Sequence, residues 1–207
     1  MKRIIASAVT AICLSLVTSS AFAQFGGLGL GSSKGESKVD PEKIEAMLKE
    51  VVVTSLIATS KLNEALGDSK NASAAAGKAE CLQKDTCGVK DATGTLSGLS
   101  ESLGKKIEAQ KASGEKLSAE ASKKAMEALL PAVKVIPLWA LVTKGGAEIA
   151  KNPFQAAKAP ELMLAVLAVP DAMATTISLI KASIDYLSFS GADVKDISTT
   201  LKKQLGS

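Results

Sequence analysis

The stretch "DPEKIEAMLKEVVVTSLIATSKLNEALG", residues 40–67, decides the fold class of this chain. Its first three residues, 40–42, are typical of a helix start: an aspartate that caps free amides, a proline at the first helical position and an acid in the first turn. Apolar residues then recur three or four apart over 44–66, and Gly67 is a typical stop. The β-branched run at 51–54 favours a strand only locally, so the stretch predicts a long amphipathic helix.

The rest of the chain shows the same helical pattern. Residues 68–83 are rich in helix-forming Ala and Lys but have little apolar stripe, which predicts a weak helix, and Leu96, Leu99, Leu103 and Ile107 then form a thin stripe on a polar helix. No segment alternates with period two, and the Asn-Gly and Asp-Gly pairs typical of hairpins are missing. The sequence therefore predicts an all-α, multi-helix bundle that forms a single domain over residues 41–205, a length that suits one hydrophobic core.

The second half of the chain carries most of the apolar residues. Five of the six prolines lie between 131 and 170, and we expect them to divide this half into short or kinked helices. The segment "PELMLAVLAVP" at 160–170 is apolar nearly all round, so we expect it to be buried on every side. We further expect Asp171 to cap a separate amphipathic helix, and this half to supply the buried centre of the bundle.

The first 23 residues have the order of a secretory signal peptide. A basic start at 1–3 precedes an apolar run over 4–17, and a small-x-small cleavage site ends at Ala23. A membrane-spanning anchor is the weaker alternative, because a span needs about 20 apolar residues. Cleavage near Ala23 predicts a periplasmic or secreted protein, in which the Gly/Ser-rich residues 24–40 form a flexible tether before the domain.

Removal of the signal peptide leaves Cys81 and Cys87 as an even pair of cysteines in an oxidising compartment. A zinc site would need four ligands, and a thiol oxidoreductase normally has two residues between its cysteines rather than the five found here. We therefore expect a structural Cys81–Cys87 disulfide at a helix–helix corner, with an exchangeable disulfide as the alternative. A loop this short would contribute about 2–3 kcal/mol by the chain-entropy argument.

Several function classes are disfavoured by the residues that are missing. The chain has no histidine, and Arg3, its single arginine, lies in the signal peptide. Histidine is the usual acid–base and metal-binding residue near pH 7, and arginine is the residue that usually binds phosphate through paired hydrogen bonds. Aromatic residues are 3% of the chain, so a basic stacking surface for nucleic acid is not expected. We identify no catalytic, cofactor-binding or metal-binding residue, expect no nucleotide partner, and do not expect an enzyme.

The one tryptophan, Trp139, stands in the apolar stretch "KVIPLWALVTKGG". The simpler interpretation is a core residue, and the alternative is an anchor for a partner or a membrane interface, together with Leu138 and Leu141. The apolar segments 128–142 and 162–180 could form a buried hairpin or one that inserts into lipid, as in helical pore-forming proteins.

These patterns favour a non-enzymatic exported helical protein that acts through protein–protein contacts, with an envelope protein or a second copy as partner. The alternative function is a lipid- or membrane-binding module that uses segments 128–142 and 162–180. An unfamiliar enzyme is the third and weakest hypothesis, because Ser, Lys, Asp, Glu and the one tyrosine would have to carry its chemistry.

Overall fold

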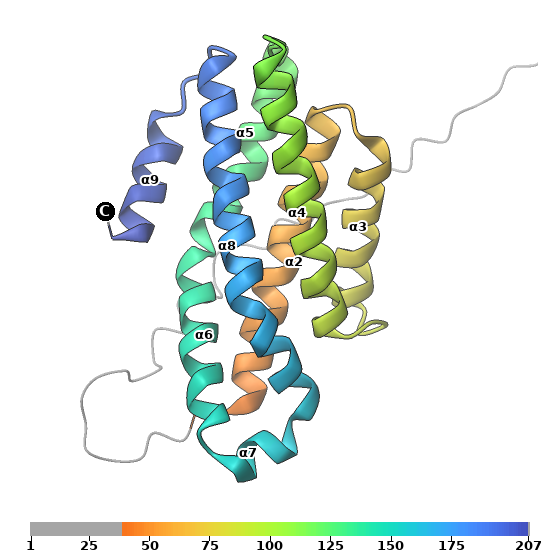
Figure 1. Ribbon diagram of the computed structural model, residues 1–207, viewed down its shortest axis with the longest axis vertical. Coiled ribbons are helices and arrows are strands. Elements are labelled where there is room, and N and C mark those ends of the chain that lie inside the picture. Colours follow the sequence, from red (N-terminus) through yellow and green to blue (C-terminus); the bar gives the residue numbers. More distant parts are fainter. Residues whose placement is uncertain (1–38, 207) are drawn as a thin grey trace, which may run out of the picture. The chain divides into compact units, whose positions relative to one another are not determined.

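The computed structural model describes residues 39–206, so the expected signal peptide (1–23) and nearly all of the expected tether (24–40) lie outside the described residues. Within them every regular element is a helix, which confirms the all-α class. The helices, coloured along the chain in Figure 1, are α2 (Pro41–Ala65), α3 (Ser69–Gln83), α4 (Val89–Ala112), α5 (Ala119–Lys134), α6 (Ile136–Ala150), α7 (Pro153–Lys158), α8 (Pro160–Phe189) and α9 (Lys195–Leu205).

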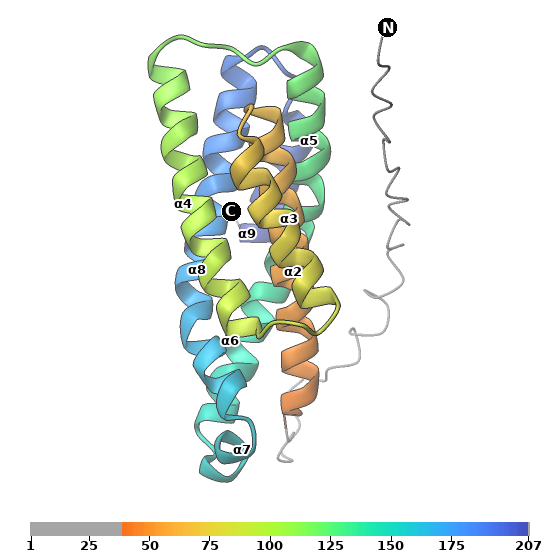
Figure 2. The same cartoon turned by 90° about the vertical axis from the view of Figure 1, so that its right-hand side faces the viewer.

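The long helices lie side by side along one direction (Figures 1 and 2). Helix α2 contacts α3, α4, α5 and α6, and α8 contacts α4, α5 and α6. Helix α3 packs against α2 and α4, while α9 packs against α5. The short helix α7 lies at one end, where it connects α6 to α8.

Local capping explains where the helices begin and end. The side chain of Asp40 accepts a hydrogen bond from the amide of Glu42 at 3.1 Å, which starts α2 as the sequence predicts. Helices α2, α4 and α8 each end at a glycine with positive φ: Gly67 (+70°), Gly114 (+77°) and Gly191 (+92°). Only glycine enters this region without a Cβ clash, so these boundaries could be predicted from the sequence.

The centre of the bundle is built on α2 as much as on the second half of the chain. Met47, Leu48, Val51, Val52 and Leu56 of α2 have no exposed surface. The expectation that the second half supplies the buried centre is confirmed only in part: Leu129, Trp139 and Ile180 are buried there, but α2 also lies in the centre, against α5 and α6.

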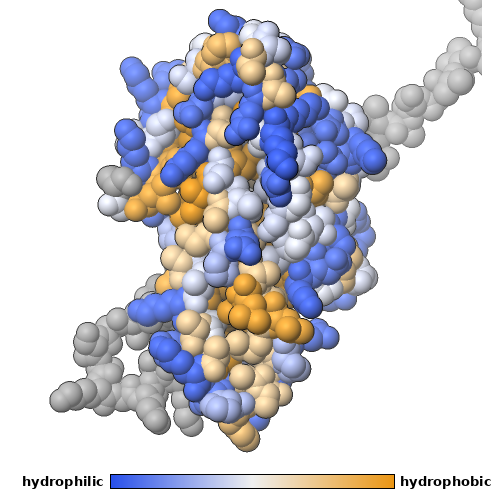
Figure 3. Space-filling view, viewed as in Figure 1, coloured by the Kyte–Doolittle hydropathy of each residue, from blue (hydrophilic) through white to orange (hydrophobic). Residues whose placement is uncertain are grey.

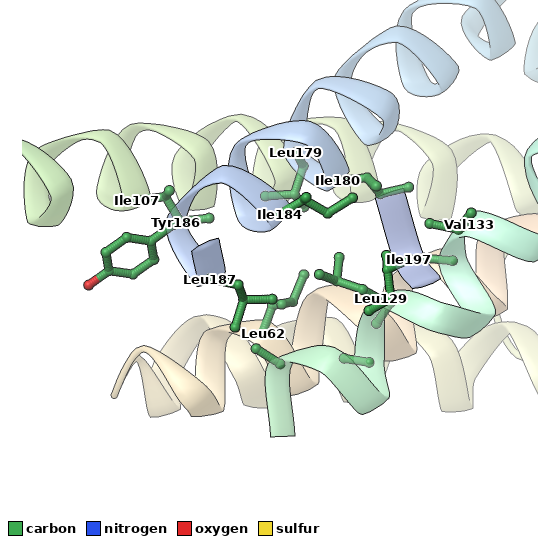
Figure 4. Packing of buried hydrophobic residues seen from close by; sticks show 14 of the residues in the cluster. Leu62, Ile107, Leu129, Val133, Leu179, Ile180, Ile184, Tyr186, Leu187 and Ile197 are labelled. Carbon is green, nitrogen blue, oxygen red and sulfur yellow. The ribbon is translucent and has the colours of Figure 1, made fainter. Parts of the chain in front are cut away.

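A second region of the core joins six helices, α2, α4, α5, α6, α8 and α9 (Figure 4). Leu62 of α2 and Ile107 of α4 belong to it, together with Leu129 of α5, Ile184 of α8 and Ile197 of α9. Burying a side chain of this size contributes about 1.5–3 kcal/mol, so this cluster holds the terminal helix α9 on the bundle.

Buried positions recur with alternating steps of three and four residues along the long helices. In α4 the pattern is shown by Thr93, Leu96, Ser100, Leu103 and Ile107, with Ala92 buried beside the first of them. An average step of 3.5 residues is typical of helices that pack nearly parallel with interlocking side chains. The apolar periodicity of the sequence therefore follows from the packing of the helices against one another.

Helix α8 continues through Pro170, so the expected break there, with Asp171 as the cap of a separate helix, is wrong. Proline removes the hydrogen bond to the carbonyl of Val166, and the Pro170 ring lies on the exposed side of the helix. Val169 and Ala172, on either side, are fully buried. Packing of these neighbours keeps the chain helical where the local signal favours a stop.

Candidate binding surface

Large apolar side chains are exposed mainly at the end of the bundle that carries α7. Four are exposed in the described residues: Leu130 (39%), Phe154 (69%), Leu164 (48%) and Leu167 (73%). The last three lie within 14 positions of one another, on α7 and the first turns of α8. Figure 3 shows hydrophobic surface over this part of the molecule. We call Phe154, Leu164 and Leu167 the α7–α8 apolar surface.

The cap that starts α7 places Phe154 on this surface. The side chain of Asn152 accepts hydrogen bonds from the amides of Phe154 (3.1 Å) and Gln155 (3.3 Å), which starts α7. The ammonium of Lys158 lies 4.3 Å from the centre of the Phe154 ring, a cation–π contact that orients the exposed ring. Gln155 Nε2 also donates to the carbonyl of Val39 at 3.3 Å, so the described chain begins at this same end.

The exposure of Leu164 and Leu167 corrects the expectation that 160–170 is buried on every side. The segment is apolar all round, yet only one side of it packs, with Leu162, Ala165 and Val169 at most 2% exposed. Sequence reasoning missed the exposed side, although a signal was present. Asp171 and Lys181 are exposed positions later in the same helix. Leu164 lies seven residues before Asp171 and Leu167 lies fourteen residues before Lys181, so each leucine is on the same side of the helix as one of these charged residues.

The structure places the tryptophan region inside the bundle. Trp139 has no exposed surface, Leu138 is 5% exposed, and Leu141 is half-buried. In this arrangement Trp139 fills the core between α6 and its neighbours. A role as a partner or membrane anchor would require α6 to leave the bundle, and that role stays a prediction.

Cys81 and Cys87 form a disulfide at the corner between α3 and α4, with Cα atoms 5.6 Å apart. Asp85 lies inside this loop, and its carboxylate accepts a hydrogen bond from Lys49 Nζ of α2. The disulfide loop is therefore connected to the central helix by an ion pair as well as through α3.

The shifted pKa values of acidic groups trace helix-surface ion pairs. The carboxyl pKa is lowered where a lysine three or four residues away donates a hydrogen bond, and these carboxylates belong to Glu80, Glu101, Glu120 and Glu148. The pKa of Asp68 is lowered mainly by the hydrogen bond from the amide of Asn71. Burial raises the pKa of Tyr186, whose hydroxyl donates to the carbonyl of Glu115 at 3.2 Å. Each of these groups has a structural partner.

An open groove of about 450 Å³ lies at the opposite end, between the start of α5 and the α8–α9 connection. Leu117 and Met126 contribute apolar surface, and Lys123, Glu127 and Asp193 contribute exposed charges. Across residues 39–206, no three His, Cys, Asp or Glu side chains are grouped so that they could hold a metal ion.

Two helical segments, Ala119–Ala150 and Pro160–Phe189, are long and apolar enough to cross a membrane by length and composition. Their best windows have mean hydropathies of 1.7 and 1.8, and 56% and 39% of these windows are buried in the bundle. Core helices of soluble proteins also meet this criterion, so the finding is weak evidence for membrane insertion.

No protein-family model, curated protein or solved structure matches this chain.

Proposed function

We propose that this is an exported, non-enzymatic helical protein that binds another envelope protein through the α7–α8 apolar surface. In this proposal residues 1–23 direct export and are removed near Ala23, and residues 24–40 tether a single domain spanning 41–205. The mature protein then works in the periplasm or outside the cell. The observation that carries the proposal is the exposure of Leu164 and Leu167 on a helix that is packed on one side only.

Burial of this surface by a partner would be favourable. Leu167 and Phe154 keep most of their surface in solvent, and removing apolar area from water contributes about 25 cal/mol per Å². Exposed aromatic and leucine side chains gathered at one place are typical of binding sites, whereas singly scattered ones are common on any protein. Three such residues within α7 and the start of α8 fit a contact of this kind.

Site-directed photo-crosslinking in the native envelope tests the protein-binding proposal. A crosslinking residue at position 167 should give an adduct with one defined protein, and Leu164→Asp in the same chain should abolish that adduct. Position 181 is the matched control, because Lys181 is exposed on the same helix but lies outside the apolar surface. Equal adducts from 167 and 181, or none from 167, would contradict the proposal.

Export is tested separately. The mass of the cellular protein should correspond to a chain that begins at Gln24, and the protein should be released with the periplasmic fraction. An intact 207-residue chain recovered from the cell interior, with Cys81 and Cys87 as free thiols, would contradict this part of the proposal.

Lipid binding is the second candidate function. It is favoured by the length and hydropathy of Ala119–Ala150 and Pro160–Phe189, which carry the expected segments 128–142 and 162–180. Insertion would bring Lys134 and Asp171 towards the bilayer, and a charge at its centre costs about 3 kcal/mol or more. Contact of the apolar surface with the interface alone avoids that cost.

Vesicles distinguish the two candidates. The lipid function predicts that the protein co-sediments with phosphatidylcholine vesicles, that Leu167→Asp weakens this binding, and that brominated lipids quench Trp139 only if α6 leaves the core. Lack of binding to phosphatidylcholine and to mixed phosphatidylglycerol vesicles excludes the lipid function and leaves the protein-binding proposal standing.

A further inference from the structure

The turn closed by the disulfide has the same hydrogen bonds as three other helix ends in this protein. At the end of α3, the amide of Asp85 donates to the carbonyl of Leu82 (3.3 Å), and the amide of Thr86 donates to the carbonyl of Cys81 (3.0 Å). The same pair of bonds ends α2 at Gly67, α4 at Gly114 and α8 at Gly191. This arrangement needs one residue in the left-handed region at the turn.

Three of these four turns place glycine in that position, and the α3 turn places Asp85. With φ of +54°, Asp85 is the one non-glycine residue between 39 and 206 with a positive φ. A side chain makes this conformation unfavourable, although aspartate tolerates it better than most residues. The turn that lacks glycine is also the turn that the Cys81–Cys87 disulfide closes.

The aspartate has a contact that glycine could not make. Its carboxylate pairs with Lys49 Nζ of α2, so the corner between α3 and α4 is held against the central helix. The side chain of Asp85 is 81% exposed and that of Lys49 is 30% exposed, and an exposed pair of this kind is weak unless its geometry is fixed in advance.

We infer that the disulfide does at this corner what glycine does at the other helix ends: it holds Asp85 in the left-handed region and so keeps its carboxylate on Lys49. The corner is therefore a thiol-sensitive latch between α3 and α2. Reduction by a dithiol breaks the sulfur–sulfur bond, leaves Cys81 and Cys87 as thiols and converts the dithiol to its own disulfide. In the reduced chain Asp85 can reach the left-handed region only at a cost in free energy, so the corner opens more often and releases Lys49.

The coupling has a thermodynamic signature. In the oxidised chain the small covalent ring restricts the corner before folding, so the conformational cost of Asp85 is already met in the unfolded state. In the reduced chain that cost falls on folding, and glycine at position 85 would relieve it. Asp85→Gly should therefore lower the unfolding constant of the reduced chain but not that of the oxidised chain.

The experiment compares Asp85→Gly with the parent, both in the oxidised protein and in a Cys81→Ser/Cys87→Ser background. Without the disulfide, Asp85→Gly should lower the unfolding constant by about threefold to tenfold, the range expected for relief of one left-handed residue. With the disulfide, it should leave the unfolding constant unchanged or raise it a few-fold, because the Lys49 contact is lost. The same effect in both backgrounds would overturn the inference.

Asp85→Asn separates charge from backbone conformation, because asparagine tolerates the left-handed region but cannot pair with Lys49 as a carboxylate. Its effect on the unfolding constant should have the same direction with and without the disulfide. A difference between the two backgrounds as large as that of Asp85→Gly would also overturn the inference. If the serine variant does not fold, dithiothreitol is added to the folded native protein and hydrogen exchange is followed. Exchange at Asp85 and Thr86 should rise at least tenfold while exchange in α8 stays unchanged, and unchanged exchange at the corner contradicts the latch.

Discussion

Gly146 of α6 lies directly against Val166 of α8, with the position of a Cβ on Gly146 only 3.1 Å from the Cβ of Val166 and closer still to both of its methyl groups. There is no room for a side chain at this crossing. The adjacent Gly145 faces Ile44 of α2 in the same way. The two glycines therefore allow α6 to approach both α8 and α2, which a "KGG" in a helical segment does not by itself predict.

Gly146→Ala should destabilise the protein. Overpacking costs about 1–3 kcal/mol, and the better helix propensity of alanine offsets up to about 1 kcal/mol of this. Gly98→Ala in α4 is the matched control, since a Cβ there meets nothing within 4 Å, and it should stabilise by about 0.5–1 kcal/mol. Denaturant unfolding measures both. A stabilising Gly146→Ala, or a loss that Val166→Ala does not relieve, would show that α6 and α8 do not meet here.

Trp139 should tolerate phenylalanine far better than alanine. It is fully buried, and its indole N–H has no hydrogen-bond partner in the described structure, so each truncation has two parts. Both substitutions remove the unpaired buried donor, whose burial costs about 1–3 kcal/mol. Alanine also leaves a large cavity and should cost about 3–5 kcal/mol, whereas phenylalanine leaves a much smaller one. Unfolding curves followed by circular dichroism measure these costs.

The fluorescence of the native protein gives an independent check on the burial of Trp139. As the only tryptophan of the chain, it should emit in the blue-shifted range and resist quenching by iodide in the absence of lipid. Strong quenching in the folded state would place α6 outside the core, and would favour the membrane-anchor interpretation of Trp139, Leu138 and Leu141.

Asp68 should make stability depend on acidic pH. It caps α3, and the amide of Asn71 and the ammonium of Lys106 hold the pKa of its carboxyl below the usual value. Because the folded-state pKa is depressed, the stabilisation is present above the unfolded-state pKa near 4 and is lost as pH falls through the folded-state value. The difference in unfolding free energy between the parent and Asp68→Ala should therefore be largest above pH 5, at about 1 kcal/mol for the lost cap, and shrink below pH 4.

Asp68→Asn is the control for that titration. Asparagine keeps the cap but has no charge, so its stability relative to Asp68→Ala should show no acid-dependent loss. A difference between the parent and Asp68→Ala that stays constant from pH 7 to pH 3 would contradict the role of the carboxylate.

Neighbouring leucines of α8 should respond in opposite ways to substitution. Leu162 is 2% exposed, so Leu162→Ala should cost about 2–5 kcal/mol. Leu167 is 73% exposed, and Leu167→Ser should change stability by no more than about 0.5 kcal/mol. Thermal unfolding of the two variants checks this difference. A large loss for Leu167→Ser would mean that the segment is buried on every side after all.

Helix starts and stops proved accessible to sequence reasoning because they depend on neighbours in the chain. Asp40 and Gly67 bound α2 as predicted, since a cap and a left-handed stop act over a few residues. Pro170 shows the limit of this reasoning. Its local effect favours a break, but the packing of Val169 and Ala172 against other helices keeps α8 continuous.

The candidate surface was harder to predict than the helices. Residues 160–170 are apolar on all sides, and composition alone does not say which side packs. Exposure of Leu164 and Leu167 depends on which face of α8 meets α4 and α6, and that is settled by contacts between segments far apart in the chain. The sequence contained only an indirect signal, the polar positions later in the same helix.

The sequence by itself determined the all-helical class, the ends of α2 and the pairing of Cys81 with Cys87, because periodicity, capping and a single nearby thiol partner are local properties. Only the tertiary structure decided that α2 lies in the centre, that Gly146 admits Val166, that Trp139 is enclosed and that Leu167 faces solvent. The physical reason is that burial is a property of the space between helices. That space is fixed when all of them pack together.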